Sequence, residues 1–258
     1  IVVVQLPHIA NFDDFDPLIR HPGVRLRYVD SPAQLDRPDL VIIPGTKTTI
    51  PDLAWMNQRG FSEAIKALHA NGVAVVGICG GYQMLGETIT DASGVDLPAG
   101  GSESGLGLLS VQTAFESVKS TRQVHFKMNG GPGLLAGASG IEGVGYEIHM
   151  GVTSPVEGAC PQTTQYMRHG TDLERSGAVN ADGNVLVGAV VSALELRDLG
   201  PAREGPRGAN GHERALGPRV GEADALGTGD QRAQVLGEFH VVDHVRRAAH
   251  AQVRGLPQ

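Results

Sequence analysis

The stretch that decides the fold is "VAVVGICGGYQMLGETI", residues 73–89, in which an apolar run leads directly into a cysteine and a pair of glycines. The run "VAVVGI" (73–78) is short, continuous and rich in valine, which predicts a buried strand of a parallel sheet. We expect a helix to follow from Tyr82 to Thr88. A buried strand that leads directly into a helix predicts a βαβ unit.

Similar patterns precede this stretch. Further buried strands are predicted at 1–6, 24–29 and 39–45. The segment 60–72, "GFSEAIKALHANG", has apolar residues at helical spacing and ends on Gly72, a suitable C-cap. This alternation predicts a doubly wound α/β structure with a mainly parallel central sheet. From residue 105 onward, "GLGLLSVQTAFE", "RQVHFKM" and "GVGYEIHMGVT" predict antiparallel strands on the same core.

Bulk properties limit the functional class. A chain of 258 residues can bury a full core. Its net charge of −7 argues against general binding to nucleic acid or to an anionic membrane, and no apolar run is long enough to span a bilayer. Two cysteines, Cys79 and Cys160, form neither a disulfide framework nor a zinc spacing, so we expect a cytoplasmic location. The start "IVVVQLPHI" lacks a signal peptide and suggests a piece of a longer chain.

Gly77, Cys79 and Gly81 form a G-x-C-x-G pattern between the predicted strand and the predicted helix. This is the cysteine counterpart of a nucleophile elbow, in which a sharp turn exposes the nucleophile above the sheet. The helix N-terminus favours a thiolate, and the N–H of Gly80 could bind an oxyanion. The pattern therefore predicts Cys79 as a nucleophile. The alternative is a buried cysteine in a glycine-rich turn.

A second glycine could contribute to the same site. Gly45 in "IIPGTKTTIPDL" (42–53) follows a predicted central strand. Its N–H could supply the other half of an oxyanion hole, because parallel strands end at one edge of the sheet. The alternative is an ordinary turn between a strand and a loop.

A cysteine nucleophile normally needs a histidine as general base. His149 in "GYEIHMG" is one candidate, with Glu147 on the same strand face. His149 could instead cap or pack a strand. His8 follows the first predicted strand and precedes an acidic loop with Asp14 and Asp16, which either binds a polar ligand or is solvated.

The segment "GICGGYQMLG" resembles the nucleophile segment of class I (triad) glutamine amidotransferases of the cobalamin-biosynthesis type. Four further stretches resemble the C-terminal amidotransferase domain of cobyric acid synthases, at 2–18, 42–56, 105–124 and 143–153. The resemblance covers residues 1–186, which we therefore expect to form one domain, and it implies a flavodoxin-like three-layer fold.

The resemblance also implies a reaction. Cys79 would attack the glutamine carboxamide, ammonia would leave, and water would hydrolyse the thioester. The ammonia would amidate the b, d, e and g carboxylates of adenosylcobyrinic acid a,c-diamide. By resemblance, an N-terminal synthetase domain binds ATP, Mg²⁺ and the corrinoid. No cofactor is expected in the amidotransferase domain itself, and its partners are glutamine and, through the other domain, the corrinoid, but neither nucleic acid nor membrane.

The sequence departs from this family after residue 186. The family's catalytic histidine lies in a motif resembling G-T-Y-x-H-G-x-F, soon after a "DGNVL"-like stretch. Here residues 182–186 read "DGNVL", but the chain continues "VGAVVSALELRDLG" and the next histidine is His212. Residues 187–258 contain no lysine or tyrosine, and we expect an aberrant or poorly ordered tail. Our hypothesis is that this tail is read in a wrong frame or joined from elsewhere, so that the chain lacks its general base.

Two alternatives remain at this level. The first is the glutaminase subunit of a related amidating ligase. That ligase is either a cell-wall amidating ligase or cobyrinate a,c-diamide synthase. The second is a catalytically inactive docking module that completes an interface with a synthetase domain.

Overall fold

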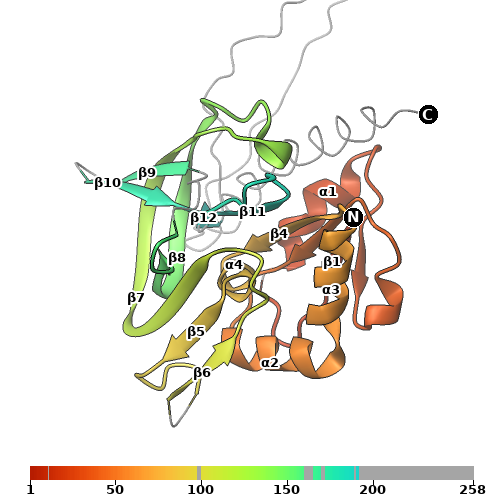
Figure 1. The fold of residues 1–258 in the computed structure, drawn as a ribbon. Helices are drawn as coiled ribbons and strands as arrows, with labels where there is room; N and C mark the ends of the chain where they lie inside the picture. The colour runs from red at the N-terminus through yellow and green to blue at the C-terminus, as the bar shows by residue number, and fades with distance from the viewer. Residues whose placement is uncertain (11, 98–99, 160–164, 170–171, 189, 192–258) are drawn as a thin grey trace, which may run out of the picture.

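The computed structural model describes residues 1–10, 12–97, 100–159, 165–169, 172–188 and 190–191 (Figure 1). Cys160 and residues 192–258, most of the predicted tail, lie outside this part of the chain. The expected domain boundary at residue 186 falls within the strand Val185–Gly188.

A five-stranded parallel sheet forms the centre of the molecule, with strand order β11-β4-β3-β1-β2. Its strands are β1 (Val2–Val4), β2 (Arg27–Val29), β3 (Leu40–Ile43), β4 (Ala74–Ile78) and β11 (Val185–Gly188). The prediction of a mainly parallel central sheet is confirmed. The predicted strands at 1–6, 24–29 and 39–45 are shorter in the structure.

The helices are α1 (Asp16–Arg20), α2 (Thr49–Arg59), α3 (Phe61–Ala70) and α4 (Gly80–Leu85), with short 3₁₀ turns at Phe12–Phe15, Pro32–Gln34 and Gly133–Leu135. The predicted helix at 60–72 is confirmed as α3. Gly72 follows it with φ +86°, the left-handed conformation that glycine adopts at a helix end. In the described part of the chain, no helix is long and apolar enough to cross a membrane.

The predicted helix from Tyr82 to Thr88 is wrong at both ends. α4 already begins at Gly80, because the carbonyl oxygen of Cys79 accepts hydrogen bonds from the N–H groups of Tyr82 and Gln83 at 3.0 and 3.2 Å. It ends at Leu85, and Thr88 already belongs to β5 (Thr88–Asp91), which pairs with two other strands. Strand pairing therefore overrides the helical pattern.

The strands predicted after residue 105 form a second sheet. It contains β5, β6 (Gly101–Ser104), β7 (Val111–Met128), β8 (Glu142–Pro155), β9 (Gln165–His169), β10 (Asp172–Ser176) and β12 (Val190–Val191). β7 and β8 are long and antiparallel, as predicted, with a shift in register between Ala114 and Lys119. β7 begins at Val111, so the segment "GLGLL" is not a strand.

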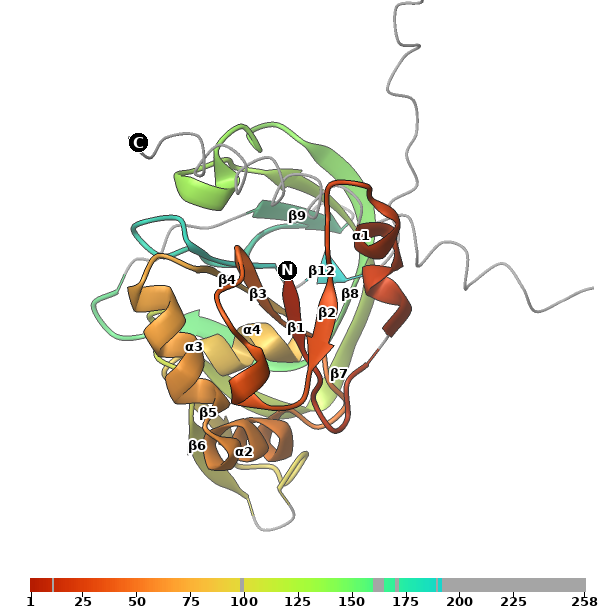
Figure 2. The same cartoon turned by 90° about the vertical axis from the view of Figure 1, so that its right-hand side faces the viewer.

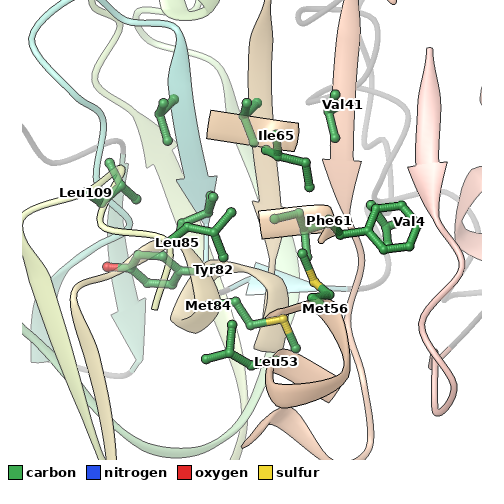
Figure 3. Packing of buried hydrophobic residues seen from close by; sticks show 14 of the residues in the cluster. Val4, Val41, Leu53, Met56, Phe61, Ile65, Tyr82, Met84, Leu85 and Leu109 are labelled. Carbon is green, nitrogen blue, oxygen red and sulfur yellow. The ribbon is translucent and has the colours of Figure 1, made fainter. Parts of the chain in front are cut away.

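The two faces of the parallel sheet bury alternate residues of each strand, as the strand period of two requires. On one face Val4 and Val41 pack with Met56 of α2 and with Phe61 and Ile65 of α3 (Figure 3). On the other face the buried cluster joins residues of the parallel sheet to β7, with Val3, Ile42, Val76, Val124, Phe126 and Met128 among its members. The molecule therefore has three layers, and Figure 2 shows the parallel sheet between α3 and β7. The third layer is built largely of antiparallel strands.

Candidate active site

Cys79 occupies the corner between β4 and α4 with φ +49° and ψ −110°. A residue with a side chain rarely adopts this conformation, which costs about 1–3 kcal/mol and persists only where the surrounding structure enforces it. Such strain is concentrated at active sites. The corner therefore has the backbone geometry that the nucleophile elbow requires.

The glycines beside Cys79 leave no room for side chains. A Cβ atom on Gly77 would lie 2.5 Å from the carbonyl oxygen of Gly81, and a Cβ atom on Gly81 would lie 2.0 Å from the carbonyl oxygen of Ile43. Both neighbours are backbone atoms of packed elements and cannot move aside easily. The G-x-C-x-G pattern thus reflects a close approach of three backbone segments.

The structure brings Gly45 and Gly80 to Cys79. A Cβ atom on Gly45 would lie 3.7 Å from Cβ of Cys79, and one on Gly80 would lie 3.5 Å from the backbone nitrogen of Thr46. The segment of Gly45 and Thr46 therefore packs directly against the elbow. The roles of Gly45 and Gly80 in binding an oxyanion stay predictions.

Glu147 and His149 lie on β8, in the second sheet. Nε2 of His149 is 2.9 Å from Oε1 of Glu147, and Nδ1 is 2.9 Å from the carbonyl oxygen of Gly151. The side chains of His149 and Glu147 are only 23% and 5% exposed. Both ring nitrogens of His149 are therefore engaged by acceptor groups.

β8 is tied to the elbow helix by one side chain. The buried amide of Gln83 on α4 donates from Nε2 to the carbonyl oxygen of Met150 at 3.0 Å, and its Oε1 is 3.4 Å from the hydroxyl of Thr49. The residue after His149 is thus held against the helix that begins at Cys79. Sequence reasoning missed Gln83, since a glutamine in an apolar helix carries no signal for such a contact.

The strand beside the elbow carries no candidate base. β11 pairs with β4 so that Gly188 lies opposite Ile78, next to Cys79. The sequence of β11 is "VLVG" (185–188), which has no titratable side chain. Val191, in the next short strand β12, pairs with Tyr146 of β8.

His8 lies at the same edge of the parallel sheet, after β1, and is held by Asp52 of α2. Nδ1 of His8 is 2.8 Å from Oδ1 of Asp52, and the backbone N–H of His8 donates to Oδ2 at 3.2 Å. The hydroxyl of Thr46 is 2.5 Å from the same Oδ2. The Asp52 side chain is 1% exposed, whereas that of His8 is 54% exposed. Sequence reasoning singled out His8 but missed Asp52, because it did not predict α2.

The fold also shifts the pKa values of Tyr82 and Asp91. Burial raises the pKa of Tyr82, on α4, to about 12. Burial alone would also raise the pKa of Asp91, but hydrogen bonds from the backbone N–H groups of Leu97, Val95 and Asp96 lower it below its ordinary value. Asp96 in turn accepts a hydrogen bond from the N–H of Ile50, in the first turn of α2, at 3.0 Å.

Structures of low sequence identity share this fold. PurLQS from Thermotoga maritima has a TM-score of 0.55 at 19% identity, covering 73% of this chain and 85% of that chain. A structure described as a GMP synthase protein from Thermoplasma acidophilum has a TM-score of 0.55 at 10% identity, covering 98% of this chain and 95% of that chain.

Sequence comparison is more specific. Cobyric acid synthase of Salmonella heidelberg is 49% identical over 184 residues, which are 71% of this chain and 35% of that protein. The Salmonella arizonae protein of the same name is 49% identical over 200 residues, which are 77% of this chain and 37% of that protein. The chain thus spans about a third of the length of these relatives. Residues 1–189 match the CobB/CobQ-like glutamine amidotransferase domain, and the chain belongs to that family.

Proposed function

We propose that this chain is the glutamine-hydrolysing part of a cobyric acid synthase, with Cys79 as its nucleophile. The observation that carries the proposal is the strained elbow of Cys79, packed against Gly45, in a chain 49% identical to cobyric acid synthases. The thiolate of Cys79 attacks the carboxamide carbon of glutamine, and the C–N bond breaks as the nitrogen takes a proton and leaves as ammonia. Water then hydrolyses the glutamyl thioester to glutamate and the free thiol.

The oxyanion of each tetrahedral intermediate needs two donors. The N–H of Gly80, at the start of α4, and the N–H of Gly45 are the groups we propose. The packing of Gly45 and of the Thr46 backbone against Cys79 and Gly80 supports this assignment. One such donor commonly contributes about 3–4 kcal/mol to the transition state.

The general base is the incomplete part of the site. We propose that the family's histidine motif is missing after Leu186, since Gly188 lies at the strand end beside Cys79 and "AVV" follows it in the sequence. His149 would act as base only after one of its bonds to Glu147 or Gly151 opens. We therefore expect Cys79 to react with glutamine analogues while complete turnover is slow.

The amidation of the corrinoid belongs to the part of the relatives' length that this chain does not span. We propose that ammonia released at Cys79 is used there to amidate the b, d, e and g carboxylates of adenosylcobyrinic acid a,c-diamide. ATP and Mg²⁺ are assigned to that part as well. Among the described residues, no group of three or more His, Cys, Asp or Glu side chains is arranged to hold a metal ion. A reducing compartment such as the cytoplasm would keep Cys79 reduced.

The test is labelling of the full chain by a diazoketone analogue of glutamine, located by mass spectrometry, together with an assay for released ammonia. We expect stoichiometric labelling at Cys79, which excess glutamine slows. Cys79→Ala should abolish both labelling and any ammonia release. Ammonia release that persists in Cys79→Ala would reject Cys79 as the nucleophile.

A chimera tests the missing base. Residues 187–258 are replaced by the corresponding segment of a Salmonella cobyric acid synthase, which should carry the histidine motif. We expect ammonia release to rise by about 10²–10⁴-fold, the usual contribution of a general base. If the original chain already turns over as fast as the chimera, it already holds a working base, for which His149 is the candidate within residues 1–186 and His212 is the first histidine beyond them.

Two alternatives make different predictions. If the chain is a docking module without catalysis, glutamine should not slow the labelling of Cys79, either in the original chain or in the chimera. The glutaminase of a related amidating ligase would hydrolyse glutamine but would not support corrinoid amidation when mixed with a cobyric acid synthase synthetase part.

A further inference from the structure

We propose that Asp52 is a positioning residue for the glutaminase reaction, which holds the segment of Gly45 and Thr46 against Cys79 through the Thr46 hydroxyl and through His8. This inference rests on the proposed function, because it concerns the oxyanion side of that site. Asp52 itself is not placed in contact with the substrate.

The first observation is the burial of the carboxylate. The Asp52 side chain is 1% exposed in the first turn of α2, where the positive end of the helix dipole favours an anion. A buried carboxylate is stable only where donors surround it. Three donors do so here: the N–H and the ring Nδ1 of His8, and the Thr46 hydroxyl.

The second observation is that all three donors come from two segments that pair with each other. Ile9 and Thr46 form an antiparallel bridge. The N–H of Lys47 donates to the carbonyl oxygen of His8 at 3.1 Å, and the N–H of Ala10 donates to the carbonyl oxygen of Gly45 at 2.8 Å. Asp52 therefore joins the loop after β1 to the loop after β3 at the same place.

The third observation is the position of this junction relative to the elbow. A Cβ atom on Gly80 would lie 2.9 Å from Cγ2 of Thr46, which is its nearest neighbour. Gly45, the residue before Thr46, packs against Cys79. Moving a reacting group or an oxyanion donor by about 1 Å can reduce a rate about 100-fold. A link that fixes Thr46 therefore controls the distance between the proposed donor at Gly45 and the carbonyl attacked by Cys79.

The experiment compares two alkylation rates at Cys79 in the full chain. A diazoketone analogue of glutamine needs the glutamine site, whereas iodoacetamide needs only an accessible thiol. The ratio of the two rate constants is the readout, because a general loss of thiol reactivity or folding would affect both reagents. Thermal unfolding of each variant is followed in parallel.

We expect Asp52→Ala to lower this ratio by about 10- to 100-fold. Asp52→Asn should recover most of the loss, because its amide oxygen can still accept from Thr46 and from the His8 N–H. Its amide nitrogen would face Nδ1 of His8, which can accept a hydrogen bond in the other tautomer. A purely electrostatic effect would not follow this order, because both variants remove the negative charge.

Asp96→Ala is the matched control. Asp96 also binds the first turn of α2, through the N–H of Ile50, but within the described part of the chain it makes no hydrogen bond to the Gly45 and Thr46 segment. We expect Asp96→Ala to lower the melting temperature and to leave the ratio within about twofold of the original chain. A loss in Asp96→Ala equal to that in Asp52→Ala would overturn the inference.

Thr46→Val keeps the inference testable if Asp52→Ala does not fold. Valine retains the shape of threonine without the hydroxyl that faces Oδ2 of Asp52. The ratio should again fall, and an unchanged ratio in folded Thr46→Val or Asp52→Ala protein would overturn the inference. If the original chain itself shows no preference for the glutamine analogue, the proposed function fails instead, so the two failures are distinguishable.

Discussion

Cys79 and the Glu147–His149 pair are both candidate catalytic groups in the sequence analysis. The structure fixes their conformations in different ways. The elbow depends on backbone crowding, in which glycines permit contacts that no side chain would. The pair on β8 depends on side-chain hydrogen bonds that engage both ring nitrogens of His149. The elbow therefore holds Cys79 in a strained backbone conformation, whereas the polar atoms of the pair contact other groups of the protein. This difference is consistent with the proposal that Cys79, and not His149, is the reactive group.

The largest effect is expected at the elbow glycine Gly81. Gly81→Ala places a Cβ atom 2.0 Å from the carbonyl oxygen of Ile43, so we expect a loss of about 3 kcal/mol in the free energy of unfolding and no labelling by the glutamine analogue. Denaturant unfolding measures this. Gly60→Ala is the control, since nothing lies within 4 Å of the Cβ position of Gly60 and only its positive φ (+81°) opposes a side chain, so about 1 kcal/mol is expected there. Equal losses would mean that crowding does not hold the elbow.

His149→Leu tests the Glu147–His149 pair on β8. The buried Glu147 carboxylate loses its partner at Nε2, so we expect a loss of about 1–3 kcal/mol in stability. The labelling rate at Cys79 should change by less than about threefold, because we do not expect the engaged histidine to act as the base. Glu147→Gln, which still offers an acceptor oxygen, is the control for stability. A fall in labelling of more than about 100-fold in His149→Leu would instead identify His149 as the base.

Asp91→Asn extends the comparison to another group held by hydrogen bonds. The backbone N–H donors lower the pKa of Asp91 in the folded state, so its contribution to stability is present above about pH 4 and is lost as the pH falls below that value. We expect Asp91→Asn to lose about 1 kcal/mol at neutral pH and to show a shallower loss of stability in acid. Urea unfolding at several pH values measures both, with the exposed Asp182→Asn as control. If Asp91→Asn loses stability in acid as steeply as the original chain, Asp91 does not contribute to this pH dependence.

The smallest effect is expected at Tyr82, beside the elbow. Burial raises its pKa to about 12, so the folded state keeps the phenol proton after the unfolded chain has begun to lose it near pH 10. Stability should therefore fall as the pH rises from about 10 to about 12, and Tyr82→Phe should remove part of this fall while changing little at neutral pH. A steep fall that persists in Tyr82→Phe would assign it to another group.

Local patterns predicted the elements that local physics determines. The valine-rich run before Cys79 is buried on both faces and forms β4, and Gly72 ends α3 in the left-handed conformation. The helix predicted from Tyr82 to Thr88 was wrong at its end because strand pairing places Thr88 in β5. A second helix was missed altogether. α2 was not predicted, because its first turn contains polar residues and Pro51, which a helix tolerates only near its start. Without α2, the contact between Asp52 and His8 could not be predicted.

The sequence by itself determined that a cysteine stands between a buried strand and a helix with glycines on either side, because these features are contiguous and follow from side-chain size and periodicity. It also determined that no histidine lies between His169 and His212. Only the tertiary structure decided that Gly45 meets Cys79, that both ring nitrogens of His149 are engaged, and that a buried Asp52 joins His8 to Thr46. Each of these contacts unites residues distant in sequence, and their geometry depends on the packing of the sheet and its helices rather than on any local propensity.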